Sequence, residues 1–221
     1  MCVQRPPHNY SEELYKMHAE IFVEHYQHSD DKDKFSVSLL LKSKLANNEY
    51  FLREMLRCWK NHNVMNKWIQ KVFQYLDRFY VKFQGLPTLM ESGSHIFKML
   101  VYDNFKVEVT IALLTMIDQE RNGTLVVDKA LVKEVIGMYV DIGSKSIETY
   151  NVDFEAPFIE ATSTYYQRVA GGWAQELTTA EYLKKVDKVI EVESAHARYY
   201  YHMQTEPKVM KVCPTPLLLP G

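Results

Sequence analysis

The sequence predicts an all-α protein of about eight helices, and three observations support this class. Glycine accounts for only 8 of the 221 residues, and five of the eight prolines lie near the two ends. Across the roughly 200 residues between them, apolar residues recur at intervals of three and four, as on one face of a helix. Capping residues and turn signals divide this pattern into separate elements.

The first two helices are expected at Tyr10–His28 and Val37–Trp59. Asn9 and Glu12 have the spacing of an N-terminal capping box, with asparagine in place of serine or threonine. The highly charged segment between the two helices predicts a solvated connection. Asn47-Asn48 is a candidate break in the second helix.

A long third helix is expected at Val64–Phe83, and Gly85 and Pro87 end it. Its apolar residues recur at helical spacing and predict a wide face toward the core. They are Val64, Trp68, Ile69, Val72, Phe73, Leu76, Phe79, Tyr80 and Phe83. The opposite side carries a polar ridge, which consists of Lys67, Gln70, Lys71, Gln74 and Arg78.

A second group of helices begins near Gly93. Its third member is stopped by Gly143, and its fourth holds Pro157 in the first turn, where proline is tolerated. The five expected ranges are His95–Asn104, Val107–Arg121, Lys129–Ile142, Asp153–Val169 and Glu181–Met203.

Local signals mark the ends of these helices. Asn122-Gly123 predicts a left-handed C-terminal cap, and Asp128 predicts an N-cap. Thr178 and Glu181 form a second capping box. Gly171-Gly172 is expected to break the helix that precedes this box.

The two groups of helices resemble each other. Each ends in a long helix with an aromatic C-terminal end, YLDRFY in the first and ARYYYHM in the second. This pattern indicates a degenerate repeat of roughly 100 residues or more, stacked as an α-solenoid whose units bury each other's faces.

Composition argues against several classes of protein. With a net charge of −2 and no basic stripe, a nucleic-acid-binding protein is not expected. The three cysteines lie far apart, so neither a zinc site nor a disulfide framework is predicted. No apolar run is long enough to cross a bilayer, and the N-terminus does not read as a signal peptide. We therefore expect a protein of the cytoplasm and nucleus, in a reducing compartment and without a membrane anchor.

The sequence offers no catalytic residue, metal site or cofactor site. It contains no phosphate-binding loop and no nucleophile elbow. His25 and His28 with Asp30 and Asp31 loosely suggest a metal site, but hydrated side chains at a helix end explain them better. Acidic pairs such as Glu191 and Glu193 are expected to be surface charge. The three tryptophans, Trp59, Trp68 and Trp173, are either interface anchors or, as we expect, core residues.

Seven stretches taken together resemble the cullin family, the elongated scaffolds of multi-subunit ubiquitin ligases. They occur in the family's order and cover about Met1 to Cys213. They are CVQRPPHNYSEELY, YLDRFYV, IDQERNG, MYVDIG, DFEAPFIEATSTYY, EYLKKVDKVIEVESAHARYYYHM and TEPKVMKVC. The resemblance is greatest to the plant-type cullins that work with F-box proteins.

The resemblance implies a non-catalytic scaffold made of cullin repeats. It assigns residues 1–88 to an incomplete first repeat and 89–206 to a second. Residues 207–221 are the start of a third repeat and a non-helical tail. In the family, the second and fifth helices of the first repeat grip a small BTB-fold adaptor that carries an F-box protein. Val64–Phe83 corresponds to the fifth helix, whereas Met1–Gln4 match only the end of the second.

The polar ridge Lys67, Gln70, Lys71, Gln74 and Arg78 is thus the candidate adaptor contact, with a simple solvated helix face as the alternative. The resemblance implies a truncated scaffold that binds the adaptor weakly, meets F-box proteins indirectly, and competes with longer cullins. The RING subunit of the ligase is not expected to bind, because the domain that grips it is missing. The alternative is a non-functional remnant or an incomplete gene model with no ligase role.

Overall fold

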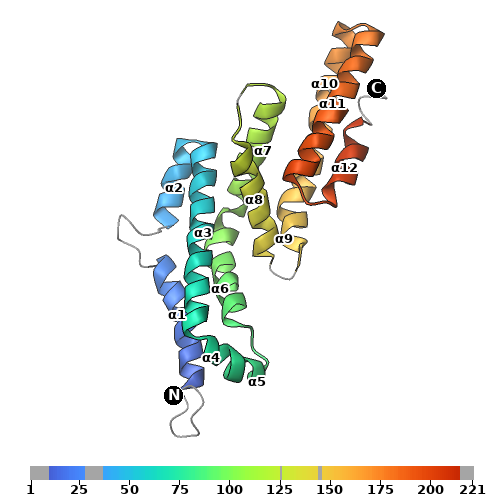
Figure 1. Cartoon of the computed structure of the whole chain (residues 1–221). Coiled ribbons are helices and arrows are strands. Elements are labelled where there is room, and N and C mark those ends of the chain that lie inside the picture. The colour runs from blue at the N-terminus through green and yellow to red at the C-terminus, as the bar shows by residue number, and fades with distance from the viewer. Residues whose placement is uncertain (1–9, 28–36, 125, 144–145, 215–221) are drawn as a thin grey trace. The chain divides into compact units, whose positions relative to one another are not determined.

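The computed structural model describes residues 10–27, 37–124, 126–143 and 146–214, and Figure 1 shows their arrangement. Helices are the regular secondary structure of these residues, and no strand occurs among them, which confirms the predicted all-α class. The chain divides into two compact units, Met1–Leu113 and Leu114–Gly221. The repeat boundaries expected after residues 88 and 206 are a statement about sequence similarity and stay a prediction.

The helices of the first unit follow one another with short connections. They are α1 (Ser11–Gln27), α2 (Val37–Ala46), α3 (Asn48–Val72), α4 (Gln74–Leu76), the π-helical turn η1 (Asp77–Val81), α5 (Lys82–Gln84), α6 (Leu89–Phe97), the π-helical turn η2 (Lys98–Tyr102) and the start of α7 (Asp103–Arg121). The end of α7 belongs to the second unit.

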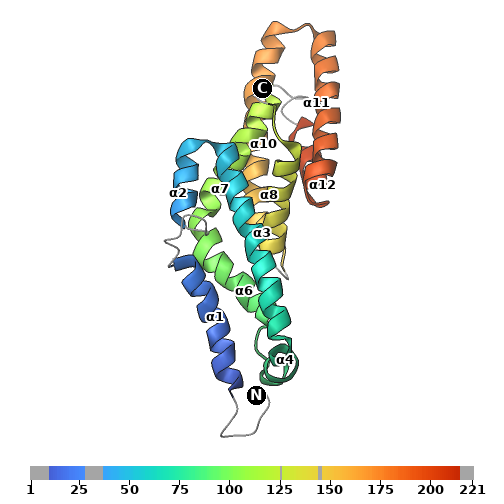
Figure 2. The same cartoon turned by 60° about the vertical axis from the view of Figure 1, so that its left-hand side comes forward.

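The second unit contains two long helices, α10 (Ala156–Glu176) and α11 (Thr179–Tyr200), which are joined by a short turn and run antiparallel (Figure 2). Its elements are α8 (Lys129–Ile142), α9 (Glu148–Tyr150), the π-helical turn η3 (Asn151–Glu155), α10 (Ala156–Glu176), α11 (Thr179–Tyr200) and α12 (Thr205–Val212).

Several predicted caps are confirmed. The Asp128 carboxylate accepts the N–H groups of Ala130 and Leu131 at 3.0 and 3.2 Å. Thr178 and Glu181 form the expected capping box of α11. Gly123 lies at φ +66°, the left-handed conformation in which glycine has no Cβ penalty. The Asn9 cap and the tail PTPLLLPG lie mostly outside the described residues.

Other helix boundaries were predicted wrongly. The residues of Leu89–Arg121 form one continuous helical run. The π turn η2 joins α6 to α7, and α7 passes through the expected gap between Asn104 and Val107. The fourth helix of the second group begins at α9 rather than at Asp153, and Pro157 follows the π turn η3. Since proline has no N–H, an ordinary α-turn there would leave a carbonyl unpaired, which agrees with the wider turn just before it.

Gly171-Gly172 does not break α10, which continues to Glu176. A Cβ at either glycine would meet no atom within 4 Å. A glycine inside a helix costs only about 1 kcal/mol relative to alanine, an amount that packing elsewhere can offset. Trp173, just beyond the pair, packs against a buried cluster of the second unit and supports the helix there.

The core of the first unit lies between α1, α3 and α6, which run side by side in both views (Figures 1 and 2). Phe22 of α1, Trp59 of α3 and Phe97 of α6 are buried there. The rings of Trp59 and Phe97 lie 5.1 Å apart. This burial confirms Trp59 as a core residue.

α3 and α6 approach each other closely at Gly93. A Cβ at this position would lie 2.4 Å from Oδ1 of the buried Asn66. The Asn66 amide also donates a hydrogen bond to the carbonyl of Met90 at 3.0 Å. Glycine is therefore required here because a neighbouring helix occupies the space of its side chain.

We expect Gly93→Ala to lower the free energy of unfolding by about 1–3 kcal/mol, because α3 or Asn66 must shift to admit the methyl group. Gly137→Ala is the matched control, since Gly137 lies inside α8 and a Cβ there meets nothing within 4 Å. The control should be neutral or stabilise the protein by up to about 1 kcal/mol. Urea denaturation followed by circular dichroism measures both variants, and equal effects would contradict the prediction.

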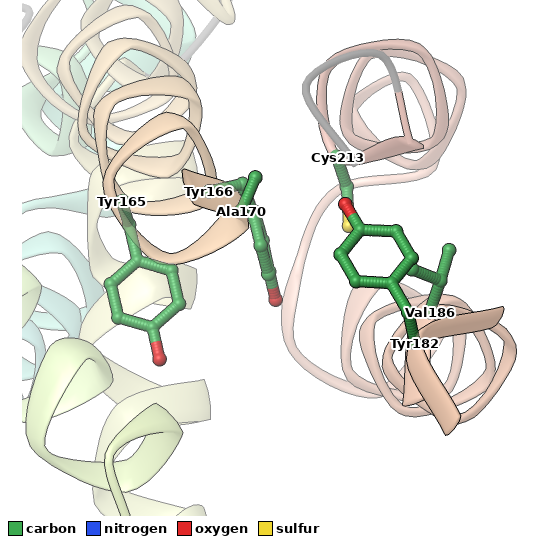
Figure 3. Close-up of a cluster of buried hydrophobic side chains, with 6 residues drawn as sticks. All are labelled: Tyr165, Tyr166, Ala170, Tyr182, Val186 and Cys213. Carbon is green, nitrogen blue, oxygen red and sulfur yellow. The ribbon is translucent and has the colours of Figure 1, made fainter. Parts of the chain in front are cut away.

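The second unit has its own buried cluster, drawn in Figure 3. Tyr166 and Ala170 of α10 face the α11 side chains Tyr182 and Val186 and the Cys213 thiol beyond α12, while Tyr165 points to another side of α10 (Figure 3). Burial raises the pKa of the Cys213 thiol to about 12. This cysteine is therefore a packing residue that stays protonated at neutral pH.

A buried ion pair connects α7, α10 and α11 in the same unit. Arg121 Nε donates to Glu193 Oε1 at 2.8 Å, and its Nη2 donates to the other carboxylate oxygen and to Thr162 Oγ1, each at 3.0 Å. The Tyr166 hydroxyl donates to Glu193 as well, at 2.7 Å. The prediction of Glu193 as surface charge was wrong, because its side chain is only 3% exposed and fully paired.

Candidate functional site

The C-terminal half of α3 carries three residues of the predicted ridge. Lys67 and Lys71 are exposed, and Gln70 is half-buried. The Lys71 ammonium lies 4.8 Å from the ring centroid of Trp68, a cation–π contact that orients both side chains. The side-chain amide nitrogen of Gln70 lies 3.5 Å from a carboxylate oxygen of Asp77, beyond the end of α3.

The helix does not continue to Phe83, so the prediction of one helix at Val64–Phe83 was wrong. The expected start at Val64 was also wrong, because α3 runs without interruption through residues 60–63. It begins instead after the predicted break at Asn47, whose side chain caps the helix by accepting the Tyr50 N–H at 2.7 Å. At its C-terminal side the backbone leaves the α conformation at Phe73, with φ −100° and ψ 15°. α4, η1 and α5 then turn away from the axis of α3 (Figure 1).

Tertiary packing explains the break at Phe73. Leu76 and Val81 are buried with Leu89 of α6, and the Asp77 carboxylate accepts the Leu89 N–H at 2.9 Å. A straight helix would carry Leu76 and Val81 away from this cluster. Two of the ridge residues, Gln74 of α4 and Arg78 of η1, therefore stand on different elements from the other three.

Five of the nine apolar residues expected to face the core are exposed, three are half-buried, and Leu76 is buried. The exposed ones on α3 are Val64, Trp68 and Val72, at 58%, 62% and 74% exposure. Beyond the break, Phe79 is about half exposed, as is Tyr75, which was not among the residues expected in the core, and the two ring centroids lie 4.4 Å apart. The side of α3 that faces the core instead carries residues such as Phe51, Met55 and Trp59, with His62 and Asn66. The segment thus presents an exposed apolar stripe.

We call this region, which extends from the C-terminal half of α3 through α4 and η1 toward α5, the α3–α5 surface. It consists of the apolar residues Val64, Trp68, Val72, Tyr75 and Phe79 with the ridge residues Lys67, Gln70, Lys71, Gln74 and Arg78. An exposed apolar stripe edged by cationic and amide groups is the composition of a protein-binding surface, in which large side chains supply affinity and the polar edge supplies orientation.

Comparison with known proteins identifies the family of the chain. The family model of the cullin α-solenoid domain matches residues 1–219. The chain belongs to the cullin family. Its relatives include putative cullin-like protein 1 of Arabidopsis thaliana, which is 36% identical over 99% of this chain and 29% of that protein. Cullin-2 of the same plant is 33% identical over 99% of this chain and 28% of its own length.

Cullin-1 of Oryza sativa subsp. japonica is 35% identical over 96% of this chain and 27% of that protein. The chain therefore spans less than a third of the length of these cullins. The family assignment confirms the fold expected from the resemblance, an α-solenoid of cullin type.

The ridge residues of this cullin were predicted from a pattern of apolar and polar residues whose burial in the structure differs from the expected one. The spacing separates the apolar residues from the polar ones, but on α3 the apolar residues Val64, Trp68 and Val72 are exposed together with Lys67 and Lys71. Sequence reasoning missed Val64, Trp68 and Val72 as surface residues. One signal was available: if the helix that holds Trp59 continues without a break, the core face of Phe51, Met55 and Trp59 runs on to His62 and Asn66 rather than to Val64 and Trp68.

The other tryptophan predictions have mixed outcomes. Trp68 was expected in the core, and this was wrong, since its side chain is the second most exposed of the three α3 stripe residues. Trp173 is half-buried, with the Lys185 ammonium 4.1 Å from its ring centroid. Only Trp59 is fully packed inside the cullin fold.

Among the described residues of this cullin, no group of three or more His, Cys, Asp and Glu side chains is arranged to hold a metal ion. His28, Asp30 and Asp31 of the loosely suggested site lie outside the described residues. None of the described helices is both long and apolar enough to cross a membrane. The arrangement on the α3–α5 surface suits non-covalent binding.

Proposed function

We propose that this chain is a non-catalytic scaffold protein of cullin–RING ubiquitin ligases, which binds a BTB-fold adaptor through the α3–α5 surface and meets F-box proteins through that adaptor. Membership of the cullin family supports the scaffold role. The observation that carries the binding proposal is the exposed stripe of Val64, Trp68 and Val72 on α3.

The chemistry of the surface indicates how the adaptor is held. Trp68 provides a large flat anchor, and the cation–π contact with Lys71 limits its motion before binding. Such preorganisation reduces the entropy that is lost on association. The cations Lys67, Lys71 and Arg78 favour a partner with an acidic rim, which sets orientation and the rate of encounter.

A titration of the purified chain against the adaptor in complex with an F-box protein tests this function. Calorimetry should give a dissociation constant in the micromolar range or tighter. A longer cullin added to the calorimeter cell should displace the chain from the adaptor. Competition of this kind is part of the proposal. The absence of binding at tens of micromolar would contradict it, since the binding free energy would then be weaker than about −6 kcal/mol.

The variant Trp68→Ala should weaken adaptor binding by at least about 10-fold, because truncating a central aromatic anchor commonly costs about 2 kcal/mol of binding free energy. Its fold should be unaffected, since the side chain is 62% exposed. Val107→Ala is the matched control: Val107 is 61% exposed on α7 and lies outside the α3–α5 surface. An equal loss in both variants would show that another surface binds the adaptor.

A further inference from the structure

A cavity of about 300 Å³ lies in the second unit between the end of α7, α10 and α11. Aromatic rings of α10 form one wall, with Tyr165 and Tyr166 near the buried ion pair and Trp173 farther along the helix. Val189 and Val192 of α11 form the facing wall, and Val192 is 43% exposed. The cavity therefore offers apolar and aromatic surface that solvent reaches.

The charges around this cavity are unevenly distributed. Arg121 and Glu193 at its base neutralise each other as an ion pair. At one end, Lys185 and Lys188 are exposed, and no ion pair joins either to another described residue. At the other end, Glu120 lies 3.9 Å from the ring of His196.

The two ends are well separated. Lys185 and His196 are eleven residues apart on α11, which corresponds to about 16 Å along a helix. The cavity thus has a cationic end and an anionic end with an apolar middle. A ligand that matches this pattern must place its negative charge near Lys185 and Lys188.

We propose that this cavity binds an acidic peptide segment of a partner protein, with one large apolar side chain inserted between Trp173 and Val192 and its carboxylates against Lys185 and Lys188. The site lies within Leu114–Gly221, whereas the α3–α5 surface lies within Met1–Leu113, so the proposal does not depend on adaptor binding.

Three physical arguments favour this ligand. The volume suits one large side chain, and aromatic walls gain free energy from contact with it. Lys185 and Lys188, one helical turn apart and in no ion pair with another described residue, attract a segment with more than one carboxylate. Lys185 covers Trp173 by a weak cation–π contact, and an incoming carboxylate can engage the lysine while the apolar side chain takes its place on the indole.

Fluorescence anisotropy of the full chain with a fluorescein-labelled octapeptide, Glu-Asp-Glu-Phe-Leu-Glu-Asp-Glu, tests the site. We expect saturable binding below about 1 mM that weakens at least about 10-fold when serine replaces phenylalanine and leucine, or when lysine replaces the acids. If the altered peptides or a single-stranded oligonucleotide bind as tightly as the original, the proposal is wrong.

Variants of the chain locate the binding. Lys185→Glu combined with Lys188→Glu should weaken binding at least about 10-fold, and Val192→Ser should weaken it about 3-fold or more. Lys184→Glu is the matched control, since Lys184 is an exposed neighbour on α11 that does not line the cavity. An equal loss with Lys184→Glu would mean attraction to the general surface of the helix and would overturn the proposal.

Discussion

Arg121→Ala should lower the free energy of unfolding by about 3–5 kcal/mol, since it leaves the Glu193 carboxylate buried without its counter-charge. The two side chains are 8% and 3% exposed. Burial alone would raise the pKa of Glu193, but the charge and hydrogen bonds of Arg121 outweigh it and hold that pKa below its usual range. Glu193 is therefore ionised at neutral pH and needs its partner.

Urea denaturation followed by circular dichroism measures this loss, and two further variants interpret it. Arg198→Ala removes an ion pair with Glu206 whose arginine side chain is 71% exposed, so it should cost less than about 1 kcal/mol. Replacing Arg121 and Glu193 together by leucine should cost less than Arg121→Ala alone, because no charge is then stranded. A loss with Arg121→Ala as small as that of the exposed pair would contradict the account.

Helix ends that depend on local chemistry could be predicted from the sequence. The Asp128 cap, the Thr178–Glu181 box and the left-handed Gly123 involve atoms within a few residues of one another. Such signals act before tertiary structure forms, so one sequence is enough to find them. The all-α class followed from the same kind of local pattern.

Boundaries set by distant residues could not be found in this way. The break at Phe73 depends on Leu76 and Val81 packing with Leu89, and on the Asp77 carboxylate accepting the Leu89 N–H. Nothing in the periodicity of residues 64–83 indicates this contact. Periodicity shows that a helix has two faces, but the rest of the fold decides which face is covered.

The candidate site shows the same limit. The ridge residues Lys67 and Lys71 were found from their polarity, yet Trp68 and Val72, each next to one of them in the chain, were assigned to the core because apolar residues usually lie there. The Arg121–Glu193 pair was also missed, since 72 residues separate its members. Exposed apolar residues and buried charges are the exceptions that sequence patterning misplaces, and in this chain they mark the proposed binding surface and the ion pair expected to be most sensitive to substitution.

Acidification should destabilise the first unit through His62. The ring is 2% exposed, and burial lowers the pKa of His62 to about 4, with a further contribution from the charge of His25. Its Nδ1 lies 2.6 Å from the Tyr26 hydroxyl, and among the described residues its Nε2 has no hydrogen-bond partner. The rings of Trp59 and Phe97 pack on it, 5.7 and 4.8 Å away, and no carboxylate among the described residues pairs with it, so a charged imidazole there has lost its hydration without gaining a counter-charge.

The direction of the effect follows from proton binding. The unfolded chain takes up a proton on His62 near pH 6.5, the ordinary value for histidine, while the folded protein resists until about pH 4. Stability is therefore fully present above pH 6.5 or so and is lost as the pH falls through this window. Between about pH 7.5 and about pH 5 the loss from this one group is about 2 kcal/mol.

Urea denaturation at several pH values tests this, with His62→Leu as the decisive variant. The leucine protein starts from a different stability, because Tyr26 loses its partner, but its stability should fall about 2 kcal/mol less than that of the natural chain over the same pH range. His95→Gln is the control, since His95 is exposed on α6 and is hydrated whether or not the chain is folded. Parallel pH profiles for the natural chain and His62→Leu would show that the buried imidazole is not the group that titrates.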